Sequence, residues 1–127
     1  MPEKHLYEYA VIRIVPKVER EEFVNTGIIL FCKRQKFLAV QYKLNTAKIM
    51  LFDKEADVDM FEKNLQSFQK ICKGTKEGGR IGEMDLADRF RWLTAVRSSC
   101  IQTSRPHTGF SSDLSATLNS LFNQLVQ

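Results

Sequence analysis

The sequence predicts one α+β domain: an antiparallel β-sheet, made of a meander of three strands plus a later strand, with helices packed mainly on one face. Three observations support this prediction. The chain has 127 residues, of which 43% are apolar, which is enough for one core. Its first third holds three segments with strand character, and the remainder holds apolar stripes at helical spacing. The order of strand, strand, strand, three helices, strand and helix is typical of a sheet covered by helices.

Residues 6–15 (LYEYAVIRIV) predict the first strand. Apolar side chains occupy most positions on both of its alternating faces, so we expect a central strand. Pro16 ends it, because proline has no N–H group for the next ladder bond. Residues 17–25 then form a charged connection with room for a helical turn.

The next two strands are expected to form a hairpin. Residues 27–32 (GIILFC) are apolar without interruption, which is typical of a strand buried on both faces. Gly27 at its start predicts a bulge or a close approach of another backbone segment. A four-residue loop at 33–36 leads into a third strand at 37–42.

Capping residues mark the first two helices. Asn45 begins a short helix, and Asp57 begins a longer one that Gly74 ends. Residues 73–83 predict a flexible Gly-rich loop, which lacks the phosphate-loop motif of nucleotide-binding proteins. The longer helix has one apolar stripe, formed by Val58, Phe61, Leu65, Phe68 and Cys72.

Two further helices flank a short strand in the last third. Asp85 predicts the start of one helix, whose core side is Leu86, Phe90, Leu93 and Val96. Residues 99–104 have β character and predict a strand of the sheet, and residues 105–109 predict a turn. Ser112 is the expected N-cap of the last helix, whose apolar face is Leu114, Leu118, Leu121, Phe122 and Leu125.

Composition restricts the class of protein. A net charge of +4 and a pI near 9.1 permit an anionic partner without requiring one. Three widely spaced cysteines, Cys32, Cys72 and Cys100, match neither a zinc pattern nor a secreted disulfide framework. The N-terminus lacks a signal region, and no apolar run reaches the ~18 residues of a membrane span. We therefore expect a cytoplasmic protein without membrane contact, metal or cofactor.

Residues 89–113 carry the clearest functional signal. Four arginines lie there with several hydroxyl and amide groups, and Asp113 is the only acid. This excess of donors predicts an anion from outside the segment. Arg97 is the best candidate to bind that anion through its guanidinium group, and Trp92 offers a face on which a base can stack. The structural alternative is that Trp92 fills the core and the arginines are surface residues; it is stronger for Arg91 and Arg105 than for Arg97.

A second group of candidates lies near the end of the first strand. Arg13 sits among apolar residues and needs a partner, since an unpaired buried charge is costly. It either pairs with a glutamate nearby (Glu8, Glu19 or Glu22) or points into a pocket. Arg20 and Asn25 are placed to meet an anion, and Glu22 to orient an arginine or act as a base. Alternatively, Asn25 and Gly27 only shape the entry to the second strand.

Catalytic residues are harder to name. The two weak candidates are Glu22 and His107, and His107 can equally be a turn residue that bonds locally. We expect Cys100 to be a half-buried strand residue and not a nucleophile, because no feature of the sequence indicates an activated thiol. The predicted ligand-binding set is Arg13, Arg20, Asn25, Arg97, Ser98, Ser99, Gln102 and His107.

Two blocks of the chain together resemble the bacterial domain-of-unknown-function family numbered 3037. The first is YEYAVIRIVPKVEREEFVNTGIILFC and the second is RFRWLTAVRSSCIQTSRPHTG with the leucine-rich helix that follows. Members of that family have no assigned activity. Their genes lie beside those of HipA-type kinases, so the resemblance implies a toxin–antitoxin or stress-regulation setting and a possible kinase partner. Residues 73–83 do not fit the family pattern.

The leading hypothesis is a non-enzymatic binding or accessory protein with an arginine cluster for a phosphate-containing ligand or a protein partner. One alternative is a small enzyme acting on a nucleotide-like substrate, with Glu22 or His107 as the base and Arg97 as the charge stabiliser. Another is nucleic-acid binding through the basic patch at residues 33–48. The structural alternative is that this patch is a solvated hairpin tip.

Overall fold

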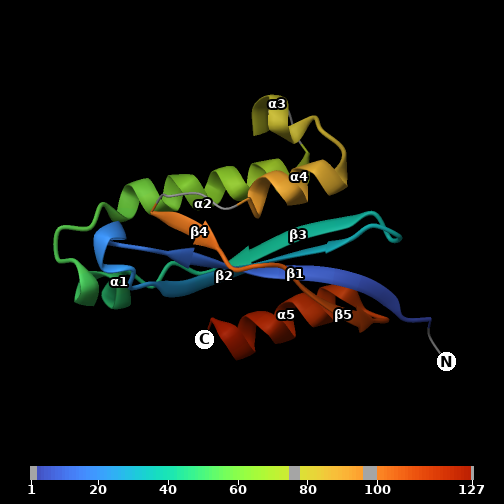
Figure 1. Cartoon of the computed structure of the whole chain (residues 1–127), viewed down its shortest axis with the longest axis horizontal. Helices are drawn as coiled ribbons and strands as arrows, with labels where there is room; N and C mark the ends of the chain where they lie inside the picture. Colours follow the sequence, from blue (N-terminus) through green and yellow to red (C-terminus); the bar gives the residue numbers. More distant parts are fainter. Residues whose placement is uncertain (1–2, 75–77, 96–99, 127) are drawn as a thin grey trace.

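The computed structural model describes residues 3–74, 78–95 and 100–126. In these ranges five strands and five α-helices are found, in the predicted order except that α3 and β5 are additional (Figure 1). Their bounds are β1 His5–Ile14, β2 Val24–Cys32, β3 Phe37–Tyr42, α1 Thr46–Phe52, α2 Val58–Lys73, α3 Gly79–Gly82, α4 Leu86–Leu93, β4 Ile101–Thr103, β5 His107–Ser111 and α5 Leu114–Leu125. A 3-10 turn, η1 Val18–Arg20, lies in the charged connection after β1, as predicted.

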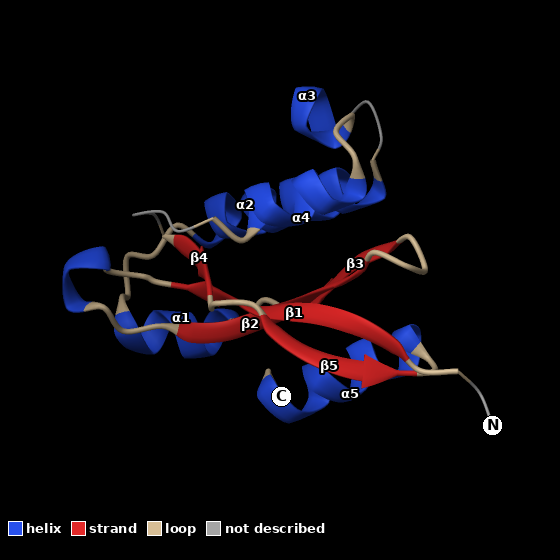
Figure 2. Cartoon of the chain, turned by 45° about the vertical axis from the view of Figure 1, so that its right-hand side comes forward, coloured by secondary structure: helices blue, strands red, loops and turns tan. Residues whose placement is uncertain are grey.

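The sheet is antiparallel and has the order β3-β2-β1-β4, with β5 also pairing β1. β1 is central, which confirms the prediction from its two apolar faces. β4 and β5 share the same edge of β1: β4 pairs with its residues 12–14 and β5 with its residues 5–9. Figure 2 shows these two segments following each other along β1.

Helices cover both faces of the sheet, with more of them on one. α2 and α4 lie on the first face, with α3 outside them, and α5 lies on the other (Figures 1 and 2). Ala10, Ile12 and Ile29 face α2 and α4, whereas Val11 and Ile28 face α5. The α+β prediction is confirmed, and the apolar residues on both sides of β1 and β2 explain why α5 takes the second face.

Gly27 sits at a bulge and at a close backbone approach, so both predicted reasons for a glycine apply. The register of β1 against β2 shifts here: Gly27 lies opposite Ile12 but Asn25 lies opposite Arg13, which leaves Thr26 as the extra residue. A Cβ atom on Gly27 would lie 2.8 Å from Tyr42 Cβ and 2.9 Å from the Gln41 carbonyl oxygen.

We expect Gly27→Ala to lower the free energy of unfolding by about 2 kcal/mol, measured by urea denaturation, because β2 and β3 must separate to admit the methyl group. Gly109→Ala is the matched control. There the obstacle is the phenol of Tyr7, a side-chain end that can swing away, so the loss should be smaller. Equal losses in the two variants would contradict the tight β2–β3 contact.

Helix caps agree with the sequence except at α5. Asn45, Asp57 and Asp85 accept hydrogen bonds from the backbone N–H three residues later, and Gly74 ends α2 with φ of 70°. The prediction of Ser112 as the last cap is wrong. Asp113 takes that place because its carboxylate reaches the N–H of Ala116 at 3.1 Å.

Two other predictions need correction. Residues 105–109 are not simply a turn, because β5 begins at His107 and forms a ladder with β1; residues 104–106 separate β4 from β5 along this edge. Part of the expected loop at 73–83 is helical: α2 reaches Lys73 and α3 occupies Gly79–Gly82. Residues 75–77 lie outside the described part of the chain, as does Val96.

Candidate functional site

Arg13 lies in a polar row that crosses three strands. The register places Asn25 of β2 and Gln102 of β4 directly opposite it, so the three side chains share the α5 face. The Arg13 guanidinium stacks on Phe23, with 4.3 Å from Cζ to the ring centroid. Among the described residues, no carboxylate forms an ion pair with Arg13, and its buried Nε has no hydrogen-bond partner. The expected Arg–Glu pair is therefore replaced by an arginine–aromatic contact.

Arg20 and Glu22 satisfy each other. Arg20 Nε lies 2.8 Å from Glu22 Oε1, on a surface where the two side chains are 59% and 37% exposed. The predicted anion ligand and the predicted base are thus one surface ion pair, which is weak because water screens it.

Two of the four arginines in the donor-rich segment, Arg89 and Arg91, have partners elsewhere in the chain. Arg89 is only 8% exposed, and its Nη1 donates to the carbonyl oxygens of Ile71 at 2.8 Å and Cys72 at 3.1 Å. Arg91 forms a two-pronged contact with Glu8 at 3.1 and 3.2 Å. Arg97, Ser98 and Ser99 lie outside the described residues, so their predicted role stays a prediction.

Trp92 lines a pocket instead of filling the core. Its side chain is 39% exposed, and the pocket of about 300 Å³ lies between α2, α4 and β4. Cys100 also lines this pocket. The other thiol nearby, Cys72, is structural: burial raises its pKa to about 12, only partly offset by the Arg89 guanidinium, so it stays protonated near neutral pH.

The two catalytic candidates lie far apart. His107 lies opposite Tyr9, with the two ring centroids 5.3 Å apart, and is exposed. Glu22 precedes β2, whose residue Val24 lies opposite Ile14. Tyr9 and Ile14 are five residues apart on β1, which is about 17 Å in a strand. Glu22 and His107 therefore do not form one acid–base site.

Lysine and asparagine side chains converge where β2 begins and α5 ends. A pocket of about 330 Å³ there is lined by Val24, Asn25, Lys43, Asn45, Lys48 and Val126. We call it the two-lysine pocket. No carboxylate lines it among the described residues, so its two ammonium groups give it a positive field.

Local hydrogen bonds fix the walls of the two-lysine pocket. The backbone N–H of Lys43 donates to the Thr26 carbonyl at 2.9 Å, which ties the end of β3 to β2. Asn45 Oδ1 accepts from the Lys48 N–H at 3.0 Å, which begins α1. Asn25 Nδ2 donates to the Leu125 carbonyl at 3.1 Å, across 100 residues of sequence, while its buried Oδ1 has no partner within the described chain.

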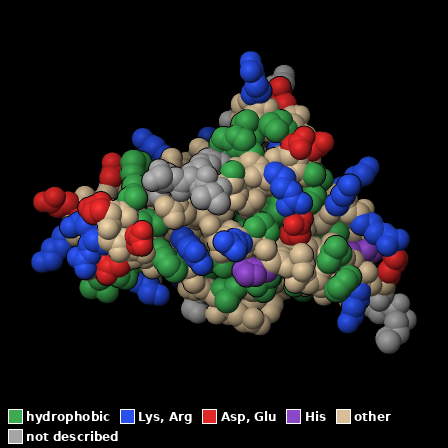
Figure 3. All heavy atoms as spheres, in the orientation of Figure 1, with side chains coloured by type: hydrophobic (Ala, Val, Ile, Leu, Met, Phe, Trp, Pro, Cys, Tyr) green, Lys and Arg blue, Asp and Glu red, His purple; other side chains and the backbone are tan. Residues whose placement is uncertain are grey.

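Sequence reasoning named Asn25 but missed this pocket, because it treated residues 33–48 as one basic patch. The structure divides that patch. Lys33, Arg34 and Lys36 lie at the hairpin tip, whereas Lys43 and Lys48 lie at the other end of β3, about 20 Å away for six strand residues. On the face seen in Figure 3, basic side chains are scattered among acidic and apolar ones and form no continuous stripe.

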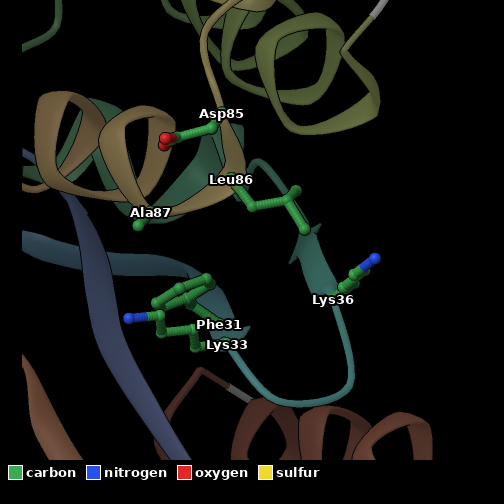
Figure 4. Close-up of a pocket in the computed structure, with 6 residues that line it drawn as sticks. All are labelled: Phe31, Lys33, Lys36, Asp85, Leu86 and Ala87. Carbon is green, nitrogen blue, oxygen red and sulfur yellow. The ribbon is translucent and has the colours of Figure 1, made fainter.

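The hairpin end has a cavity of its own. It measures about 410 Å³ and is lined by Phe31, Lys33, Lys36, Asp85, Leu86 and Ala87. Figure 4 shows Leu86 reaching from α4 toward the β2–β3 hairpin and the Phe31 ring beneath that helix. Lys36 points away from the cavity in this view. The walls are apolar and the basic groups stand at the rim.

Residues 9–126 match the family model described as "Protein of unknown function (DUF3037)". The chain belongs to the DUF3037 family. The match spans nearly the whole chain, which confirms the resemblance seen in the sequence, and it includes both the Arg13 row and the two-lysine pocket. No curated protein and no solved structure matched the chain. Membership in the DUF3037 family therefore brings no activity with it, and function has to be argued from the residues.

The described residues contain neither a metal-binding cluster nor a membrane-spanning helix. In the ranges 3–74, 78–95 and 100–126, no three His, Cys, Asp or Glu side chains are grouped so that they could hold a metal ion. Over the same ranges, every helix is too short or too polar to span a bilayer.

Proposed function

We propose that this DUF3037 protein is a cytoplasmic, non-enzymatic binding protein that holds a small phosphate-containing ligand in the two-lysine pocket. The observation that carries the proposal is the approach of Lys43 and Lys48 to one cavity without a lining carboxylate. Each ammonium offers three donors to an oxyanion. The volume of about 330 Å³ lies at the lower end of the range for small-molecule sites.

The side chain of Asn25 favours a ligand that carries a hydrogen-bond donor next to its negatively charged group. Its Nδ2 is committed to the Leu125 carbonyl, and its Oδ1 is buried without a partner within the described chain. A hydroxyl group beside a phosphate would satisfy that acceptor if the Asn25 amide turned toward the pocket, because Oδ1 is buried in the structure. The same Nδ2 contact also caps one carbonyl at the end of α5, which lessens the partial negative charge that a helix C-terminus would present to an anion.

The two-lysine pocket predicts a specific loss of binding. Titration calorimetry at low salt with inorganic phosphate and pyrophosphate should detect binding to the wild-type protein. Lys43→Ala with Lys48→Ala should weaken it at least about tenfold, because two charge-assisted contacts disappear. Binding should also weaken as salt is raised, since these lysines are exposed.

Lys54→Ala with Lys63→Ala is the matched control, because both lysines are exposed and line none of the three cavities above. It removes the same charge and should leave affinity within about twofold. If phosphate does not bind, or if both double variants weaken it alike, the two-lysine pocket is not the site.

The other functions have less support. The separation of Glu22 and His107 along β1 disfavours an acid–base enzyme built on them, and the face seen in Figure 3 shows no continuous basic stripe for nucleic acid. Arg97 with Ser98 and Ser99 as additional ligand groups, and a HipA-type kinase as partner, stay predictions.

A further inference from the structure

A second surface, at the hairpin end of the molecule, is apolar where soluble domains are normally polar. Leu6 and Phe110 face each other across β1 and β5 and are 53% and 68% exposed. They lie on the same side of the sheet as Phe31, which pairs with Glu8, two residues from Leu6. The distance from that row to the next on one face is about 7 Å. The exposed pair is thus adjacent to the cavity lined by Phe31, Leu86 and Ala87.

We call Leu6, Phe110 and this cavity the hairpin-end surface. Its inner border is closed by the ion pair between Glu8 and Arg91, and its outer border is the basic hairpin. A contiguous apolar patch with a polar rim is the usual mark of an interaction site in a soluble domain.

The charges of the rim specify the sign of the partner. Lys33 and Lys36 stand at the cavity mouth without an ion pair to any described carboxylate. Two of the acids nearby are paired with arginines: Glu3 with Arg34 at 3.2 Å and Glu8 with Arg91. Asp85, which also lines the cavity, accepts from the N–H of Asp88 at 2.9 Å and keeps its negative charge. Two lysines outnumber this one carboxylate in the lining, so the rim has a net positive charge and a complementary partner carries carboxylates around an apolar anchor.

Two other occupants fit less well. A symmetric contact between two copies of this chain would place Lys33 and Lys36 of both copies in one interface, which increases charge repulsion there. A membrane surface would meet protruding side chains, but the cavity is a hollow of about 410 Å³ whose Phe31 wall is only 3% exposed. A hollow of that volume can accept one inserted side chain.

We propose that the hairpin-end surface binds an acidic segment of a partner protein, with one large apolar side chain inserted between the first turn of α4 and the β2–β3 hairpin. Carboxylates on either side of that anchor meet Lys33 and Lys36. Leu6 and Phe110 extend the apolar contact. This surface is separated from the two-lysine pocket by the length of β3, so the two sites can be tested independently.

The test uses short synthetic peptide libraries on beads and the whole protein carrying a fluorescent label. One library has Asp and Glu around a single Leu, Phe or Trp; others replace the acids by Lys and Arg, or the apolar anchor by Ala. The acidic library with an anchor should retain the protein at least about tenfold more than the others. Lys33→Glu with Lys36→Glu should invert the preference toward the basic library, and Phe110→Thr should weaken retention without changing its charge preference.

Lys54→Glu with Lys63→Glu is the control and should behave as wild type, because it makes the same change in net charge at exposed positions outside the hairpin-end surface. Thermal unfolding of every variant checks that the fold is intact. Retention that ignores peptide charge, an unchanged preference in the Lys33 and Lys36 variant, binding to phosphatidylserine vesicles in place of peptides, or self-association through this face would each overturn the proposal.

Discussion

Replacing Phe90 by alanine should lower the free energy of unfolding by about 4 kcal/mol, measured by urea denaturation. Phe90 is fully buried between α4 and the sheet, and its ring stacks on Phe31 with 5.1 Å between centroids. Alanine would leave a cavity in a densely packed core, and the loss of buried apolar area and of ring contact would add together. The same change should loosen the Phe31 wall of the hairpin-end surface.

Phe110→Ala is the matched control for the loss of a phenyl ring. Phe110 is 68% exposed, so its removal should change stability by no more than about 0.5 kcal/mol. A similar loss in both variants would show that the core does not depend on the Phe31–Phe90 stack. A large change in the urea m-value would mean that the unfolded state had changed as well.

Arg89→Met should lower the free energy of unfolding by about 3 kcal/mol, because two charge-assisted hydrogen bonds to buried carbonyls are lost. The side chain reaches from α4 to the last turn of α2 and donates to Ile71 and Cys72. Gly74 leaves room for it, since a Cβ atom there would lie 2.6 Å from Arg89 Nη1. Methionine keeps the length of the stem but supplies no donor, so both carbonyls lose the guanidinium, and the Ile71 carbonyl keeps only the Gly74 N–H at 3.1 Å.

Arg91→Met tests whether the loss of stability in Arg89→Met comes from the burial of that arginine or from the loss of one positive charge. Arg91 lies on the same helix, two residues away, and pairs with Glu8 on the surface. Its replacement should cost less than about 1 kcal/mol. If both variants lost the same stability, the Arg89 contacts with α2 would not be a structural brace, and Arg89 would again be a candidate for a ligand.

Local signals in the sequence were sufficient for most elements. The apolar faces of β1 and β2 required burial on both sides, and Asn45, Asp57 and Asp85 had side chains suited to begin helices. Gly27 was recognised because a side chain in a bulged, closely packed strand has nowhere to go. In each case the signal lies within the residues of the element itself.

Predictions were wrong where two local choices were nearly equal. Ser111, Ser112 and Asp113 can all cap a helix, and the exit from β5 decides that Asp113 holds the N-cap position. Residues 105–109 contain proline and glycine and so resemble a turn, yet the free edge of β1 recruits His107–Ser111 as β5. Strand pairing at a distance decided both outcomes.

The sequence alone determined the fold class, the family and the order of the elements other than α3 and β5, because periodicity, caps and apolar runs act over short distances. It did not determine the roles of the charged residues. Arg89 and Arg91 look alike in the chain, but one braces two helices and the other pairs with Glu8, eighty-three residues away. Likewise, the two-lysine pocket exists only because Asn25 meets the end of α5. The partner of a charged side chain is whichever group the fold places within a few ångströms of it, and only the tertiary structure determines which group that is.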